Sequence, residues 1–132
     1  MTDTQSAQFP QALRTWFLIH FIVDLLFAIP LMVAPEWMLS LVGWQTVDPF
    51  TARLAAAALF GIGIESFLAR NSKTETFRSM LNLKIIWSLS AVFGISLSLI
   101  EGSQGRPWFA WTILVIFVAF NFLWVYWLKQ LK

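Results

Sequence analysis

The chain contains no cysteine, only one histidine and few charged residues. The lack of cysteine excludes disulfides, thiol catalysis, zinc sites with cysteine ligands and iron–sulfur clusters. The single histidine, His20, excludes bis-histidine haem ligation within one protomer. Charged residues make up 12% of the chain, which is about half the share found in a typical soluble domain. The composition therefore does not fit an ordinary water-soluble protein.

Apolar residues are correspondingly abundant. They form 58% of the 132 residues, and the mean hydropathy is +0.70. The net charge is only +2, and the basic residues lie at the ends of apolar stretches and not in a run. A nucleic-acid-binding protein normally gathers its basic residues into a patch or stripe. We therefore expect an integral membrane protein whose first partner is the lipid bilayer, and no nucleic-acid partner.

Four stretches approach the length of about 20 apolar residues that a membrane-spanning helix needs. They cover residues 13–33, 53–69, 80–100 and 108–128. The second stretch is the shortest, and we expect its helix to begin earlier, near Pro49. The segment before the first stretch is polar and lacks the cationic start of a secretory signal, so this stretch is expected to be retained. The sequence predicts one domain over residues 1–132, an all-α bundle of four transmembrane helices.

The connection between the first two stretches is too apolar for a plain loop. Residues 36–42 are expected to form a short amphipathic helix at the membrane interface, ended by Gly43. The later connections are short and polar. Short links between long helices place consecutive helices antiparallel and side by side.

The lysines and arginines are distributed unevenly between the two sides of the predicted bundle. The side with both termini holds Arg14, Arg70, Lys73, Arg78, Lys129 and Lys132, and the other side holds Arg53 and Arg106. Cytoplasmic ends of membrane helices carry the excess of basic residues. We therefore expect a multi-pass protein of the cell (inner) membrane with both termini in the cytoplasm. An aromatic belt is expected at the cytoplasmic interface, formed by Trp16, Trp124, Tyr126 and Trp127.

Every predicted span carries at least one polar residue in its cytoplasmic half. His20 and Asp24 are four residues apart and share a helix face, as do Lys84 and Ser88. Ionisable residues inside a membrane span are a functional-site hypothesis by default. The candidate site for a ligand or a proton consists of His20, Asp24, Glu65, Lys84, Ser88 and Asn121. No residue pattern indicates a catalytic group, a metal site or a particular cofactor.

The second span also contains small residues at helical spacing. Ala57, Gly61 and Glu65 follow one another at intervals of four, and Gly63 lies nearby. Small residues let membrane helices approach closely, so this stripe is expected to bring Glu65 against the third helix and into an ion pair with Lys84. The alternative is a structural pin, in which Lys84 extends to the headgroups. Asn121 likewise fits either a ligand site or a hydrogen bond between helices.

Residues 35–44 and 50–70 combine a proline-led amphipathic link ending in glycine with an arginine-led, glycine-rich span. In this the chain resembles the small four-helix DoxX-like membrane proteins and their uncharacterised relatives. The matching positions are Pro35, Gly43, Arg53, Gly61 and Gly63. The resemblance covers about the first half of the chain and implies a four-helix bundle, in some members associated with quinone-linked oxidoreductase complexes. It carries over no catalytic motif.

Two functions of different classes fit these observations. The first is a membrane protein without its own enzymatic chemistry that binds or transports a small molecule, an ion or a proton at the polar site. The alternative is an accessory or structural subunit of a membrane complex, such as a quinone-linked oxidoreductase. The partners expected for these functions are a small apolar ligand or quinone, a second copy of the chain, or a partner subunit. Enzymatic activity is less supported, because no serine–histidine–acid spacing is present.

Overall fold

The structure is a computed structural model that describes residues 11–102 and 105–131. The polar segment 1–10 lies outside the described residues. The helices are α2 (Gln11–Val33), α3 (Pro35–Leu41), α4 (Pro49–Leu68), α5 (Thr74–Glu101) and α6 (Trp108–Gln130). All but the short α3 are long and apolar enough to cross a membrane. The expectation of an all-α chain is confirmed over the described residues, and the four long helices suggest a multi-pass membrane protein.

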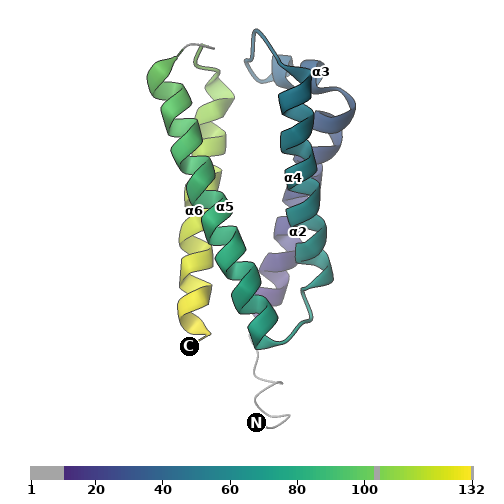
Figure 1. Cartoon of the computed structure of the whole chain (residues 1–132), viewed down its shortest axis with the longest axis vertical. Helices are drawn as coiled ribbons and strands as arrows, with labels where there is room; N and C mark the ends of the chain where they lie inside the picture. The colour runs from purple at the N-terminus through teal and green to yellow at the C-terminus, as the bar shows by residue number, and fades with distance from the viewer. Residues whose placement is uncertain (1–10, 103–104, 132) are drawn as a thin grey trace.

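The four long helices are arranged as two hairpins (Figure 1). α2 packs along α4, with α3 linking them, and α5 packs along α6. α2 begins and α6 ends at the end of the bundle where α4 connects to α5, which we call the termini end. The opposite end, which we call the α3 end, holds α3 and the α5–α6 connection. The two hairpins meet at the termini end and diverge towards the α3 end.

Prolines and glycines set the boundaries around α3. α2 ends at Val33, because the residue before Pro35 is disfavoured in helical conformation. Pro35 then opens α3, where its missing N–H is no loss. Gly43 follows with φ of +108°, and its N–H donates to the carbonyl of Ser40. The predicted short helix is therefore confirmed to within one residue at each end.

The longer helices extend beyond the apolar stretches that predicted them. α4 begins at Pro49, as expected. α5 begins at Thr74, six residues before the predicted start at residue 80. Residues 74–79 are mostly polar and exposed, so hydropathy does not detect them although they form helix. α5 ends at Glu101 and is capped by Gly102, whose φ of 67° is the left-handed conformation that glycine adopts at helix C-termini.

Asp48 caps the N-terminus of α4. Its Oδ2 accepts a hydrogen bond of 2.5 Å from Thr51 Oγ1, and its Oδ1 accepts one of 3.1 Å from the backbone N–H of Phe50. These hydrogen bonds, led by that of Thr51, hold the pKa of the Asp48 carboxyl below its usual value. Because the bonds favour the ionised form, their contribution to stability is present at neutral pH.

We expect Asp48→Ala to lower the thermal unfolding temperature at neutral pH, because two donors at the helix start lose their acceptor. Asp48→Asn keeps an acceptor oxygen and should lose less. The difference between wild type and Asp48→Ala should shrink as pH falls below about 4, since the cap is lost as pH drops through the lowered folded-state pKa. Thermal melts followed by circular dichroism across this pH range test the prediction, and a difference independent of pH would contradict it.

A packed aromatic cluster closes the termini end. It consists of Leu13, Phe17, Ala69, Phe77, Met80, Leu81, Trp124 and Trp127. Trp124 stacks on Phe120 and meets the edge of Phe17. Trp124 and Trp127 are buried in this cluster, on the face of α6 that packs into the bundle. Their expected place in an interfacial belt stays a prediction.

Candidate functional site

Lys84 forms the centre of a buried polar cluster next to the aromatic cluster. Its side chain is fully buried. Its Nζ lies 2.5 Å from Nδ1 of His20 and donates a hydrogen bond to Oγ of Ser66. The rings of Phe17 and Trp124 have their centroids 4.6 and 4.9 Å from the same Nζ, within the range of cation–π attraction. Side chains from α2, α4 and α6 thus surround the amine of α5.

His20 connects Lys84 to Asp24. A lysine ammonium only donates hydrogen bonds, so Nδ1 of His20 accepts, and the proton of the neutral ring lies on Nε2. Nε2 is 3.4 Å from Oδ1 of Asp24. The imidazole therefore bridges a basic and an acidic side chain. Their charges sum to zero when Lys84 is protonated and Asp24 is ionised, and also when both side chains are neutral. Both His20 and Asp24 are buried.

Gly63 of α4 gives Asp24 the space it occupies. A Cβ at Gly63 would lie 2.8 Å from Cβ of Asp24 and 3.3 Å from its Oδ2. Real Cβ atoms essentially never approach another heavy atom as closely as the first of these distances. Oδ2 of Asp24 is buried without a hydrogen-bond partner among the described residues. Gly63 is therefore required for the close contact between α2 and α4 at the polar cluster.

Ser88 and Asn121 extend the cluster to α6. Oγ of Ser88 donates to the carbonyl of Lys84, one helical turn away, at 2.8 Å. Nδ2 of Asn121 donates to Oγ of Ser88 at 2.9 Å and to the carbonyl of Ile85 at 3.2 Å. Asn121 thus ties α6 to α5, which is the interhelical role considered for it from the sequence.

The structure brings together five of the six predicted site residues and leaves out Glu65. Glu65 is exposed on the outer face of α4, and the predicted ion pair between Glu65 and Lys84 does not form. Ser66 occupies the expected place instead. Successive residues of an α-helix point about 100° apart, so a rotation of α4 by about 100° about its axis exchanges the two side chains. Ser66 is the contact that the sequence interpretation missed.

The predicted packing stripe on α4 is also wrong for two of its three small residues. Ala57 and Gly61 are exposed, and a Cβ added at Gly61 would meet nothing within 4 Å. The buried face of α4 consists of Ala52, Ala56, Gly63 and Ser66. α4 is apolar on all sides, so no amphipathic face marks its orientation. Gly63 and Ser66 are three residues apart and therefore share a helix face, and this spacing was the signal in the sequence for the buried face of α4.

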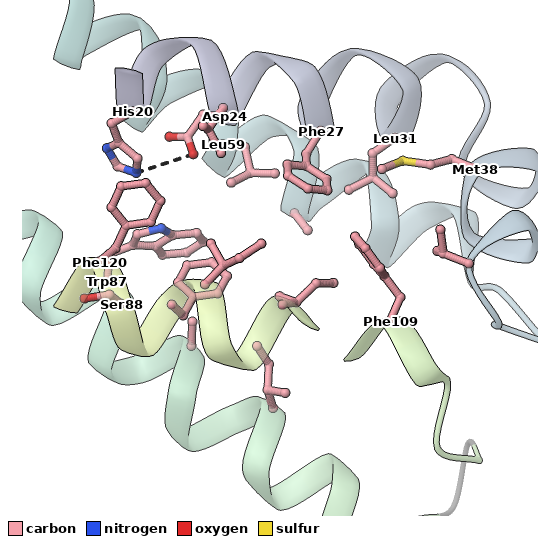
Figure 2. Close-up of a pocket in the computed structure, with 18 of the residues that line it drawn as sticks. His20, Asp24, Phe27, Leu31, Met38, Leu59, Trp87, Ser88, Phe109 and Phe120 are labelled. Atoms are coloured by element: carbon pink, nitrogen blue, oxygen red, sulfur yellow. Dashed lines mark ion pairs between the residues drawn. The ribbon is translucent and has the colours of Figure 1, made fainter. Parts of the chain in front are cut away.

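A cavity of about 330 Å³ lies between the two hairpins, beside the polar cluster. Figure 2 shows His20, Asp24, Trp87, Ser88 and Phe120 at one end of it. The lining continues towards the α3 end along Phe27, Leu31, Met38 and Phe109. Among the described residues, His20 and Asp24 are the only ionisable ones in the lining. The arrangement suits an apolar molecule that lies with one end against the polar cluster.

The described residues contain no group of three or more histidine or acidic side chains placed to hold a metal ion. The polar cluster offers one imidazole and one carboxylate, and the imidazole Nδ1 is already engaged by Lys84. A comparison of the chain with family models, curated proteins and solved structures finds no match, so the resemblance to DoxX-like proteins stays a prediction.

Proposed function

We propose that this chain is an integral membrane protein that binds a small lipophilic molecule between its two helical hairpins. The observation that carries the proposal is the cavity of about 330 Å³ that ends at the buried His20–Asp24 pair. Ligand sites are typically concave, about 300–1,000 Å³, and lined by apolar and aromatic groups with a few polar ones. Buried ionisable groups inside a membrane helix mark functional sites by default. The cavity and the cluster meet both descriptions at one place.

The outer surface of the molecule supports a bilayer environment. Large apolar side chains are exposed on all four long helices, among them Leu26, Leu54, Phe93 and Phe122. We place the chain in the cell (inner) membrane with the termini end on the cytoplasmic side, because most lysines and arginines lie there. α3 then lies at the outer interface, with Trp37 exposed. The cavity lies at the depth of the acyl chains, where a lipophilic molecule would reach it from the bilayer.

The termini end of the bundle is closed, which is more consistent with a binding protein than with a continuous pore. The aromatic cluster, with Phe17, Phe77 and Trp124 fully or almost fully buried, separates Lys84 from the cytoplasmic side. Protein interiors are packed at the density of organic crystals, so such a cluster leaves no passage for water. Transport of the bound molecule would require the two hairpins to separate at this end.

An accessory role in a membrane complex is the second candidate. The outer face of α4 favours it, because Ala57 and Gly61 leave open space on an exposed apolar helix, with Glu65 on the same stripe. Small residues spaced by four let a second helix approach closely. The occupant would be a helix of a partner subunit, and purification in a mild detergent would then retain a stoichiometric partner that Gly61→Leu releases.

Tryptophan fluorescence tests the cavity, since Trp87 and Trp124 line it. We expect a brominated naphthalene probe to quench the wild-type protein in lipid nanodiscs with a saturable curve. Ala91→Phe places a ring in the cavity and should weaken binding at least about tenfold. Ala57→Phe makes the same change on the exposed face of α4 and should bind as the wild type does. Equal, unsaturable quenching in all three proteins would show partition into lipid and would contradict the proposal.

A further inference from the structure

The charges at the inner end of the cavity balance one another without a ligand. Asp24 contacts His20, and His20 contacts Lys84, so one acidic and one basic side chain face each other through the imidazole. Lys84 also donates a hydrogen bond to Ser66 and makes cation–π contacts with the rings of Phe17 and Trp124. The net charge of the cluster is therefore zero, and among its charged atoms only Oδ2 of Asp24 lacks a hydrogen-bond partner in the described part of the chain.

The remainder of the cavity lining, as far as the structure describes the chain, provides no further charge. Apart from His20 and Asp24, the lining consists of aliphatic and aromatic side chains and Ser88. Glu65 lies on the opposite, outer face of α4. Arg53 is exposed and donates to the carbonyl of Met32, and it does not line the cavity. Transfer of an unpaired charge into such surroundings is strongly unfavourable.

We infer that the bound molecule is electrically neutral, about one or two rings in size, and that Lys84 sets this selectivity by neutralising Asp24. The inference rests on the proposed function of the cavity. The size follows from the volume, because an apolar cavity of roughly 150 Å³ accepts one benzene molecule and this one has about twice that volume. A cationic ligand would add a positive charge that Asp24 cannot balance, because the charge of Asp24 is already balanced by Lys84. An anion would meet the Asp24 carboxylate with no free counter-charge.

Three probes of one shape test the charge selectivity. Bromonaphthalene carrying a hydroxymethyl, an aminomethyl or a carboxylate group is neutral, cationic or anionic at pH 7. Binding to the protein in neutral-lipid nanodiscs is measured by tryptophan quenching, with empty nanodiscs and Ala91→Phe correcting for partition into lipid. We expect the neutral probe to bind at least about tenfold more tightly than either charged probe. Equal or tighter binding of a charged probe overturns the inference and leaves the cavity function standing, whereas no saturable binding of any probe overturns the proposed function itself.

Variants that change the charge of the cluster test the role of Lys84. Lys84→Gln retains a polar side chain of similar length but leaves Asp24 uncompensated, and should shift the preference towards the cationic probe at least about tenfold. Asp24→Asn leaves the charge of Lys84 uncompensated and should shift the preference towards the anionic probe. This variant tests the role of Lys84 if Lys84→Gln does not fold. Glu65→Gln removes one acidic charge on the outer face of α4 and should change nothing. Unchanged preference in a folded Lys84→Gln or Asp24→Asn protein overturns the role of Lys84.

Discussion

Lys84→Met is expected to lower the free energy of unfolding by about 3–5 kcal/mol, the range for leaving a buried charge without its compensating partner. The amine is fully buried, and its loss removes the hydrogen bonds that it donates to Nδ1 of His20 and Oγ of Ser66. The larger effect concerns Asp24, which remains buried after Lys84, its compensating basic side chain, has been removed. A methionine of similar length fills the space, so the loss reports on charge and hydrogen bonding and not on a cavity.

The double variant Lys84→Met with Asp24→Leu should recover most of this stability. Replacing a whole buried ion pair by apolar residues of similar volume is often neutral or stabilising, because no charge then has to leave water. Lys73→Met serves as the control, since Lys73 is exposed before α5, and it should change stability by less than about 0.5 kcal/mol. Unfolding by SDS in mixed micelles, followed by circular dichroism, measures all three. A single variant as stable as Lys73→Met would show that Lys84 does not compensate Asp24.

The sequence was sufficient for the helices because their signals are local. Long apolar runs mark α2, α4, α5 and α6, and the two prolines at positions 35 and 49 mark the starts of α3 and α4. Hydropathy failed only at the polar start of α5, where residues 74–79 extend the helix beyond the apolar run. The divergence of the hairpins, which forms the cavity, depends on contacts between distant residues and has no signature in any one segment.

The polar cluster was predictable only where it depends on the local spacing of residues along one helix. His20 and Asp24 lie on one face at a spacing of four, so their proximity follows from helix geometry alone. The partner of Lys84 depends instead on the rotation of α4 about its axis, and an apolar helix does not reveal that rotation. Several pairs of small residues in α4 have the spacing that favours close packing, including Ala52 with Ala56 and Ala57 with Gly61. Only the first pair is buried, and the choice of the second led to the mistaken Glu65–Lys84 pair.

Gly63→Ala distinguishes the two faces of α4 directly. The new methyl group would lie 2.8 Å from Cβ of Asp24 and 3.2 Å from Cδ1 of Leu25, so α2 and α4 must separate locally. Overpacking of this kind costs about 1–3 kcal/mol. Gly61→Ala, two residues earlier, adds the same methyl group where nothing lies within 4 Å. It should leave stability unchanged or raise it by up to about 1 kcal/mol through the better helix propensity of alanine.

The two glycine variants also test whether packing of α4 affects the polar cluster, because Asp24 is the residue that the methyl group at position 63 would displace. If the carboxylate must move away from α4, its contact with His20 is disturbed, and binding of the neutral probe should weaken together with stability. Gly61→Ala should retain both. SDS unfolding and probe titration on the same nanodisc or micelle preparations measure the two quantities side by side. Equal stability of the two variants would mean that the outer face of α4, with Gly61 and Glu65, packs against the bundle in the membrane, as the sequence first indicated.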